Sequence, residues 1–201
     1  MSQLDAVSRE TLAKLEIYAQ TLKKWNPRIN LVAKSTLADL WERHIVDSLQ
    51  IMAHVPDGTH HIVDIGSGGG FPGLVLAIAT SETDAETKVT MIESDQRKSV
   101  FLRTVLRETG VAAEVLTDRI ERAPPQNADL ITARALADLT SLLGFAERHL
   151  KPEGVAIFLK GKNWRSELEI AQENWHFEWK EVTSQTSVEA VLLVIKGIHR
   201  V

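Results

Sequence analysis

Apolar residues recur at helical spacing in the first quarter of the chain. Residues 4–25 carry such a stripe, and Asn26-Pro27 is expected to end the helix that the stripe predicts. The same periodicity predicts a second helix over residues 35–53, and a Pro-Asp-Gly turn follows at 56–58. We therefore expect residues 1–57 to form an N-terminal helical attachment to the rest of the chain.

The pattern changes after this turn. Short runs of buried-strand character predict strands, and segments of helical spacing separate most of them. The strands are expected at 61–65, 89–93, 113–116, 129–133 and 155–160, and the helices at 72–80, 96–108 and 138–150. Strands that alternate with helices are typical of a parallel sheet covered on both faces. The chain is thus expected to be an α/β protein.

The C-terminal part departs from this alternation. Residues 177–183 and 190–196 both have strand patterns, and the six residues between them are too few for a parallel crossover. They are therefore expected to pair as an antiparallel hairpin. This predicts a Rossmann-like, mostly parallel sheet over residues 58–201, closed by a C-terminal antiparallel hairpin.

The composition limits the reactions that the protein can catalyse and indicates its cellular compartment. The chain has no cysteine, so it has no disulfide and no thiolate metal site, and we expect it in the cytoplasm. The lack of a thiolate also excludes the usual route to methylation at carbon 5 of pyrimidines. No apolar run reaches the ~20 residues that a membrane span requires. The net charge of −4 means that any RNA binding must come from a local basic patch.

The clearest candidate site is the glycine-rich segment that follows the first strand, Asp64-Ile65-Gly66-Ser67-Gly68-Gly69-Gly70-Phe71-Pro72-Gly73. Glycines such as Gly66 and Gly68 let a backbone approach a ligand closely. The segment from Gly68 also satisfies G-x-G-x-x-G, so a dinucleotide is one possible ligand. Asp64 would repel a pyrophosphate but suits the cationic groups of S-adenosylmethionine, and the C-terminal hairpin is not typical of dehydrogenases. We therefore predict S-adenosylmethionine as the cofactor.

Carboxylates at the ends of the second and third strands are further candidates. Glu93 ends the second strand, where a carboxylate can accept both ribose hydroxyls; otherwise it is a solvated strand end. Asp118 follows the third strand, and either its side chain or the backbone amides of Ile120 and Glu121 are placed to bind the adenine amine. The alternative for Asp118 is a helix cap.

Several motifs carry a family resemblance that extends over nearly the whole chain. The chain resembles the bacterial small-subunit (16S) ribosomal RNA guanine-N7 methyltransferases, the glucose-inhibited division protein B family. The motifs are Asn30-Leu31-Val32, Arg43-His44-Ile45-Val46-Asp47-Ser48-Leu49, the glycine segment, Arg97-Lys98 with Phe101-Leu102, Arg119-Ile120-Glu121, Arg134-Ala135 and Leu159-Lys160-Gly161. The resemblance implies a class I methyltransferase core, small-subunit ribosomal RNA as partner, and cofactor contacts at Gly66, Phe71, Ile120, Glu121 and Arg134.

Methylation at guanine N7 sets modest chemical demands. The N7 lone pair is exposed at neutral pH, so the enzyme must align it with the methyl donor and needs no general base. No N-P-P-Y or D-P-P-Y sequence, the motif that handles exocyclic amines, follows the fourth strand; Thr132-Ala133-Arg134-Ala135 stands there instead. Arg134 is thus a candidate to position the guanine, a phosphate or the cofactor carboxylate. The alternative is an ion pair with Asp138.

Other polar residues have both a functional and a structural interpretation. His44, Asp47 and Ser48 share one helix face, but without a third ligand we expect a buried histidine that joins the attachment to the core, and no metal. Arg119, Lys160 and Lys162 are candidates for RNA contact, or else they are solvated.

Three other functions stay open at this stage. A methyltransferase of small molecules or proteins would lack salt-dependent RNA affinity. A nicotinamide oxidoreductase is favoured only by the G-x-G-x-x-G pattern. A catalytically inactive RNA-binding module is disfavoured because Asp64, Glu93 and the glycines are intact.

Overall fold

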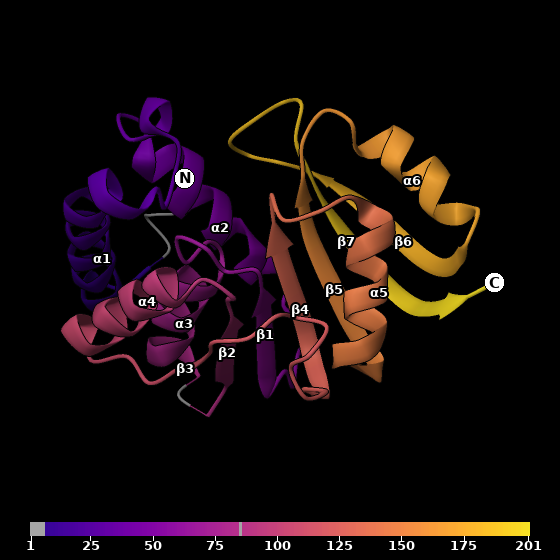
Figure 1. The fold of residues 1–201 in the computed structure, drawn as a ribbon, viewed down its shortest axis with the longest axis horizontal. Coiled ribbons are helices and arrows are strands. Elements are labelled where there is room, and N and C mark those ends of the chain that lie inside the picture. The colour runs from indigo at the N-terminus through magenta and orange to yellow at the C-terminus, as the bar shows by residue number, and fades with distance from the viewer. Residues whose placement is uncertain (1–6, 85) are drawn as a thin grey trace.

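A seven-stranded sheet forms the centre of the molecule (Figure 1). The computed structural model describes residues 7–84 and 86–201. The strands are β1 (His61–Ile65), β2 (Lys88–Ile92), β3 (Glu114–Leu116), β4 (Ala128–Arg134), β5 (Leu150–Lys160), β6 (Trp175–Thr183) and β7 (Val191–Arg200), in the order β3-β2-β1-β4-β5-β7-β6. The first five are parallel, whereas β7 is antiparallel to both β5 and β6. The predicted mostly parallel sheet with a C-terminal antiparallel hairpin is confirmed.

Helices cover both faces of this sheet (Figure 1). One face packs against α1 (Arg9–Ile29), α3 (Gly73–Thr83) and α4 (Gln96–Thr109), and the other packs against α5 (Leu139–His149) and α6 (Trp164–Gln172). The period-two geometry of strands separates the two cores, because successive side chains point to opposite faces. Leu130 lies in the first core and Ile131 in the second, although both belong to β4.

The first helix is longer than predicted at its C-terminal end. Asn26-Pro27 does not end α1, since Pro27 stands in the last turn and removes only one backbone donor there. The helix ends at Ile29 and is capped by Asn30, which has a left-handed backbone (φ 46°). The Oδ1 atom of Asn26 accepts hydrogen bonds from the amides of Leu31 and Val32 and so fixes the exit of the chain. Residues 4–6 of the predicted helix lie outside the described residues.

The predicted helix over residues 35–53 is divided into short pieces. A 3₁₀ turn (Lys34–Thr36) is followed by a π-helical turn, η3 (Trp41–Val46), then by α2 (Asp47–Leu49) and a second 3₁₀ turn, η4 (Gln50–His54). π-helical turns are frequent at functional sites because they redirect side chains. Here the turn contains His44, and Asp47 follows directly after it.

One helix and the ends of the last three strands were not predicted. The helix α6 has only nine residues, and its buried side chains are Trp164, Leu168 and Ala171, which is too short a stripe to stand out in the sequence. β5 begins five residues before its predicted start, because Leu150 pairs with Ala128 beyond an irregularity in the register.

The N-terminal attachment and the sheet share one core. Tyr18 and Leu22 of α1 are fully buried in the same cluster as Ile62 of β1 and Leu74 of α3. The predicted boundary at residues 57 and 58 therefore lies between the N-terminal helical segments and the first strand but does not separate two cores. Within residues 7–84 and 86–201, no helix is long and apolar enough to cross a membrane.

Candidate functional site

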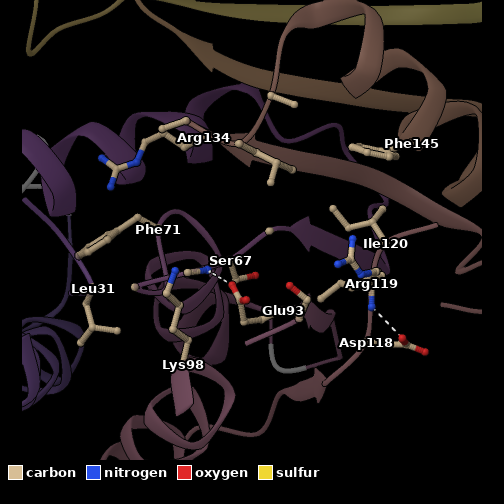
Figure 2. Close-up of a pocket in the computed structure, with 18 of the residues that line it drawn as sticks. Leu31, Ser67, Phe71, Glu93, Lys98, Asp118, Arg119, Ile120, Arg134 and Phe145 are labelled. Carbon is tan, nitrogen blue, oxygen red and sulfur yellow. Dashed lines mark hydrogen bonds between the residues drawn. The ribbon is translucent and has the colours of Figure 1, made fainter. Parts of the chain in front are cut away.

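A cavity of about 510 Å³ lies where four strands end at the same edge of the sheet (Figure 2). Its walls come from the segments that follow β1, β2, β3 and β4. β1 pairs with β2 on one side and with β4 on the other, so the strand order reverses there. Ligands of open α/β sheets bind at this kind of reversal, outside the carboxyl ends of the strands.

The structure brings most of the predicted site residues to this cavity. Those that line it are Gly66, Gly68, Phe71, Glu93, Asp118, Arg119, Ile120, Glu121 and Arg134. In Figure 2, Arg134 and Phe71 lie at one end, Glu93 is central, and Asp118 to Ile120 lie at the other end. Sequence reasoning did not assign Leu31, Lys98, Leu136 or Phe145, which also line the cavity. Leu31 and Lys98 stand in recognised motifs, whereas no pattern marked the other two.

The glycine segment has a backbone that requires glycine at its first position. Gly66 has φ 66°, and a Cβ there would collide with the side chain of Leu136. The amides of Gly66 and Ser67 both donate to the carbonyl oxygen of Ile92, at 2.8 and 3.2 Å. These backbone bonds tie the turn to the end of β2, and the Ser67 hydroxyl adds a bond to the Asp64 carbonyl at 3.0 Å.

Two buried side chains fix the rest of the glycine segment. The Tyr18 hydroxyl donates to the carbonyl oxygen of Gly69 at 2.5 Å, and burial raises the pKa of Tyr18, so the phenol stays protonated as a donor. The Glu93 carboxylate accepts from the amides of Gly68 and Asp95, both at 2.7 Å. Each carboxylate oxygen has a second lone pair and can still accept a ligand hydroxyl.

Asp64 lies behind the glycine segment and does not line the cavity. Its side chain is fully buried, and its Oδ1 accepts from the Thr132 hydroxyl of neighbouring β4 at 2.9 Å. A Cβ on Gly73 would lie only 2.6 Å from Oδ2, so this glycine makes room for the carboxyl group under α3. Burial raises the pKa of Asp64 to about 6, although the bond from Thr132 favours the charged form. The predicted direct contact with a cofactor is not supported by this position.

The far end of the cavity is built from the turn that follows β3. Asp118 accepts a hydrogen bond from the amide of Arg119 and forms an ion pair with Arg122 at 2.7 Å. In the described residues no helix begins after Asp118, so the interpretation of Asp118 as a helix cap was wrong. Ile120 is buried, and its carbonyl oxygen is hydrogen-bonded by His149 of α5 at 2.9 Å. The side chain of Arg119 is exposed at the cavity rim.

Arg134 ends β4 and is held by the N-terminal attachment. Its Nη2 donates to Nδ1 of His44 at 2.7 Å, and its Nη1 donates to the Arg43 carbonyl at 3.0 Å and to Asp47 at 3.4 Å. The guanidinium also stacks over the Phe71 ring, 4.9 Å from its centroid. The alternative ion pair with Asp138 was wrong, because Asp138 instead caps α5 by accepting from the amide of Ser141.

The contact with Arg134 settles the state of His44. Arginine only donates, so Nδ1 of His44 accepts and the proton is on Nε2, which lies 2.8 Å from the Thr36 hydroxyl. Burial and the charges of Arg134 and Arg43 lower the pKa of His44 to about 4. The prediction of a buried, hydrogen-bonded histidine that joins the attachment to the core is confirmed.

The two lysines after β5 have different surroundings. Lys160 is nearly buried; its ammonium pairs with Glu167 at 2.5 Å and donates to the Ala137 carbonyl at 2.9 Å. It therefore braces the segment after β4 against α6, which argues against the predicted role in RNA contact. Lys162 is exposed and lines hollows next to Arg134.

The cavity fits S-adenosylmethionine in volume and in donor set. Its volume lies within the ~300–1,000 Å³ typical of small-ligand sites. Glu93 offers a carboxylate to a ribose diol, and the apolar side chains of Ile120 and Phe145 flank the end where an adenine would lie. Gly66 and Leu136 both line the cavity, and the missing Cβ of Gly66 lets the Leu136 side chain pack directly against the backbone of the turn.

Solved structures define the class of fold. The fold matches a TehB-like SAM-dependent methyltransferase from Corynebacterium glutamicum (TM-score 0.60, 18% identity, 88% of this chain and 97% of that one). It matches a methyltransferase from Geobacter sulfurreducens equally well (TM-score 0.61, 16% identity, 90% and 88% of the two chains). The fold is therefore that of the class I S-adenosylmethionine-dependent methyltransferases.

The family follows from sequence comparisons. The family model GidB, described as rRNA small subunit methyltransferase G, matches residues 11–194. Relatives with the name "Ribosomal RNA small subunit methyltransferase G" include those of Ruegeria pomeroyi (55% identity, 97% of this chain and 95% of the relative) and Rhodospirillum centenum (50%, 96% and 87%). This chain belongs to the rRNA small subunit methyltransferase G family. It is thus a methyltransferase that uses S-adenosylmethionine, and the oxidoreductase alternative was wrong.

Proposed function

We propose that this enzyme transfers a methyl group from S-adenosylmethionine to N7 of a guanine in the ribosomal RNA of the small subunit. The relatives' names supply the class of RNA, and the family resemblance supplies the guanine N7. The observation that carries the choice of atom is the arrangement around Arg134, at the end of β4.

Among the described residues, neither of the proton acceptors bonded to Arg134 through its side chain is free to take a proton from a substrate. The side chains of His44 and Asp47 are both engaged by the guanidinium of Arg134. His44 uses its unprotonated nitrogen to accept from Arg134, so it has no lone pair left for a substrate proton. A junction whose two proton acceptors are both engaged by Arg134 suits a methyl acceptor that already has an exposed lone pair, as guanine N7 has.

The methyl transfer requires no proton transfer. When bound, S-adenosylmethionine supplies an electrophilic methyl group on a sulfonium. The N7 lone pair forms the new bond to this carbon, the carbon–sulfur bond breaks with its electrons left on sulfur, and the positive charge passes to the guanine ring. The residues of this chain contribute by alignment: Glu93 and the glycine segment fix the donor, and Arg134 marks where the acceptor must arrive.

Exposed basic side chains flank the two approaches to the site. Arg119 lies at the rim of the cofactor cavity, and Lys162 lies on the other side of Arg134. Both are placed to neutralise phosphates of an RNA that covers the cavity, which matters because the net charge of the whole chain is −4.

The test is methyl transfer from labelled cofactor to small subunits and to small-subunit RNA that lack the modification. We expect one labelled nucleoside, 7-methylguanosine, at a single mapped position, with RNA affinity that falls as salt rises. Label in another nucleoside would overturn the choice of N7. Label only in protein or in a small molecule would overturn the choice of RNA.

A further inference from the structure

A groove adjoins the cofactor cavity on the far side of Arg134. It consists of two hollows of about 340 and 670 Å³, which share Asp47, Arg134, Ala135, Gly161, Lys162 and Ala190 and are therefore continuous. One wall is the helical segment around η3, and the other is the connection between β6 and β7. We refer to this space as the β6–β7 groove.

The groove and the cofactor cavity meet at one place. Arg134 and Ala135 line the cofactor cavity and both hollows of the groove. A planar group bound in the groove can therefore reach the methyl donor in the cofactor cavity beside these two residues. Hydrogen bonds stabilise this geometry, since Asp47 accepts from Thr186 of the β6–β7 connection at 2.7 Å as well as from Arg134.

Charge is distributed unevenly along the groove. The guanidinium of Arg134 lies at the junction with the cofactor cavity. The larger hollow also has three exposed carboxylates, from Asp39, Glu42 and Glu189, none of which lines the cofactor cavity. Among the described residues, these carboxylates make no hydrogen bond or ion pair, so they remain available to a ligand.

This polarity matches the two edges of guanine. One edge carries the acceptors N7 and O6, and the opposite edge carries the donors N1–H and the 2-amino group. We propose, on the basis of the function proposed above, that the β6–β7 groove holds the target guanine turned out of the RNA. Its N7 edge lies at Arg134 and its donor edge faces Asp39, Glu42 and Glu189.

Two chemical consequences support this orientation. Arg134 can donate to O6 but not to N7, because the N7 lone pair must stay open to attack the methyl carbon. Methylation then leaves the ring positively charged, and carboxylates at the donor edge stabilise that charge as it forms. Adenine fits neither end, since it presents an amino donor to Arg134 and an unprotonated N1 to the carboxylates.

The first test fills the groove from one wall. Ser187 lines the larger hollow, whereas its neighbour Val188 lines none of the cavities described here and is 95% exposed. Ser187→Trp is expected to lower kcat/KM for RNA by about 100-fold with unchanged cofactor affinity, and Val188→Trp is expected to act as the wild type does. Cofactor binding and thermal unfolding show that both variants are folded. Wild-type turnover by Ser187→Trp, or an equal loss of cofactor affinity, would overturn the proposal.

The second test removes charge without changing size. The double variant Glu42→Gln, Glu189→Gln is expected to lower kcat by about tenfold with cofactor affinity preserved. Glu169→Gln, on the exposed side of α6, is the matched control and should behave as the wild type does. An unchanged kcat in the double variant contradicts the assigned orientation of the base. Failure of the proposed function is distinguishable, because the wild-type protein itself would then produce no 7-methylguanosine.

Discussion

The cofactor cavity has two walls that are held in different ways. The glycine segment after β1 is fixed through its backbone, by amides that donate to the Ile92 carbonyl and to Glu93, and by Tyr18, which donates to the Gly69 carbonyl. The segment after β4 is fixed through side chains, since Arg134 is held by His44, Asp47 and Phe71.

This difference separates two tasks. The cofactor is the same in every turnover, and a wall fixed by its backbone suits a ligand that never varies. The target base arrives on a large RNA, and a wall of interlocked side chains can be adjusted by changes in η3 or in the β6–β7 connection. The comparison predicts that changes in the first wall affect cofactor affinity, whereas changes in the second affect turnover.

The largest effect is expected at the first glycine. Gly66→Val places a branched side chain at φ 66° and against Leu136, so we expect cofactor affinity to fall by more than about 100-fold. Calorimetric titration with S-adenosylmethionine measures this. Gly144→Ala is the control, because a Cβ there meets nothing closer than Trp175 at 3.7 Å. Normal affinity in a folded Gly66→Val variant would remove the glycine segment from the site.

The second wall is tested at Arg134. Arg134→Ala is expected to reduce RNA methylation by about 100-fold and cofactor affinity by much less, because the guanidinium sits at the junction with the β6–β7 groove. Arg134→Lys should restore little activity, since lysine lacks the planar fork that reaches His44 and Asp47 together. Parallel losses of affinity and turnover would instead assign Arg134 to the cofactor.

A smaller effect is expected at Tyr18. Tyr18→Phe leaves the buried Gly69 carbonyl without its donor, which should cost about 1–2 kcal/mol of stability and weaken cofactor binding several-fold. Thr21→Val is the matched control on the same helix, because it removes the hydrogen bond to Glu108 of α4, away from the cavity. Equal cofactor affinity in the two variants would show that Tyr18 supports only the fold.

The smallest effect concerns pH. Folded His44 stays neutral down to its pKa of about 4, while the unfolded chain takes up this proton near 6.5, so acidification through this window favours unfolding. The raised pKa of Asp64, about 6, acts in the opposite direction, because the folded state holds that proton more tightly. Burial also lowers the pKa values of His61 and His149, which act in the same direction as His44, so between pH 6.5 and 5 we expect the Tm of the wild type to fall more than that of His44→Gln. An equal change of Tm in the two proteins would contradict the assigned protonation of His44.

The sequence determined the parts of this protein that depend on local pattern. Alternating strands and helices predicted the sheet, the short interval between the last two strands predicted the antiparallel hairpin, and glycine density located the cofactor turn. Glu93 was predicted from its place at the end of a strand, and it lines the cavity. These features are encoded over a few neighbouring residues, so periodicity and residue type are sufficient to find them.

Only the tertiary structure decided which distant residues meet. Nothing local shows that Tyr18 reaches Gly69, that His44 and Asp47 hold Arg134, or that Asp64 turns away from the cavity toward Thr132. Each of these contacts depends on the order of the strands and on how α1 and η3 pack across them. The cofactor turn could therefore be read from one stretch of sequence. The β6–β7 groove, whose walls come from opposite ends of the chain, exists only once the chain has folded.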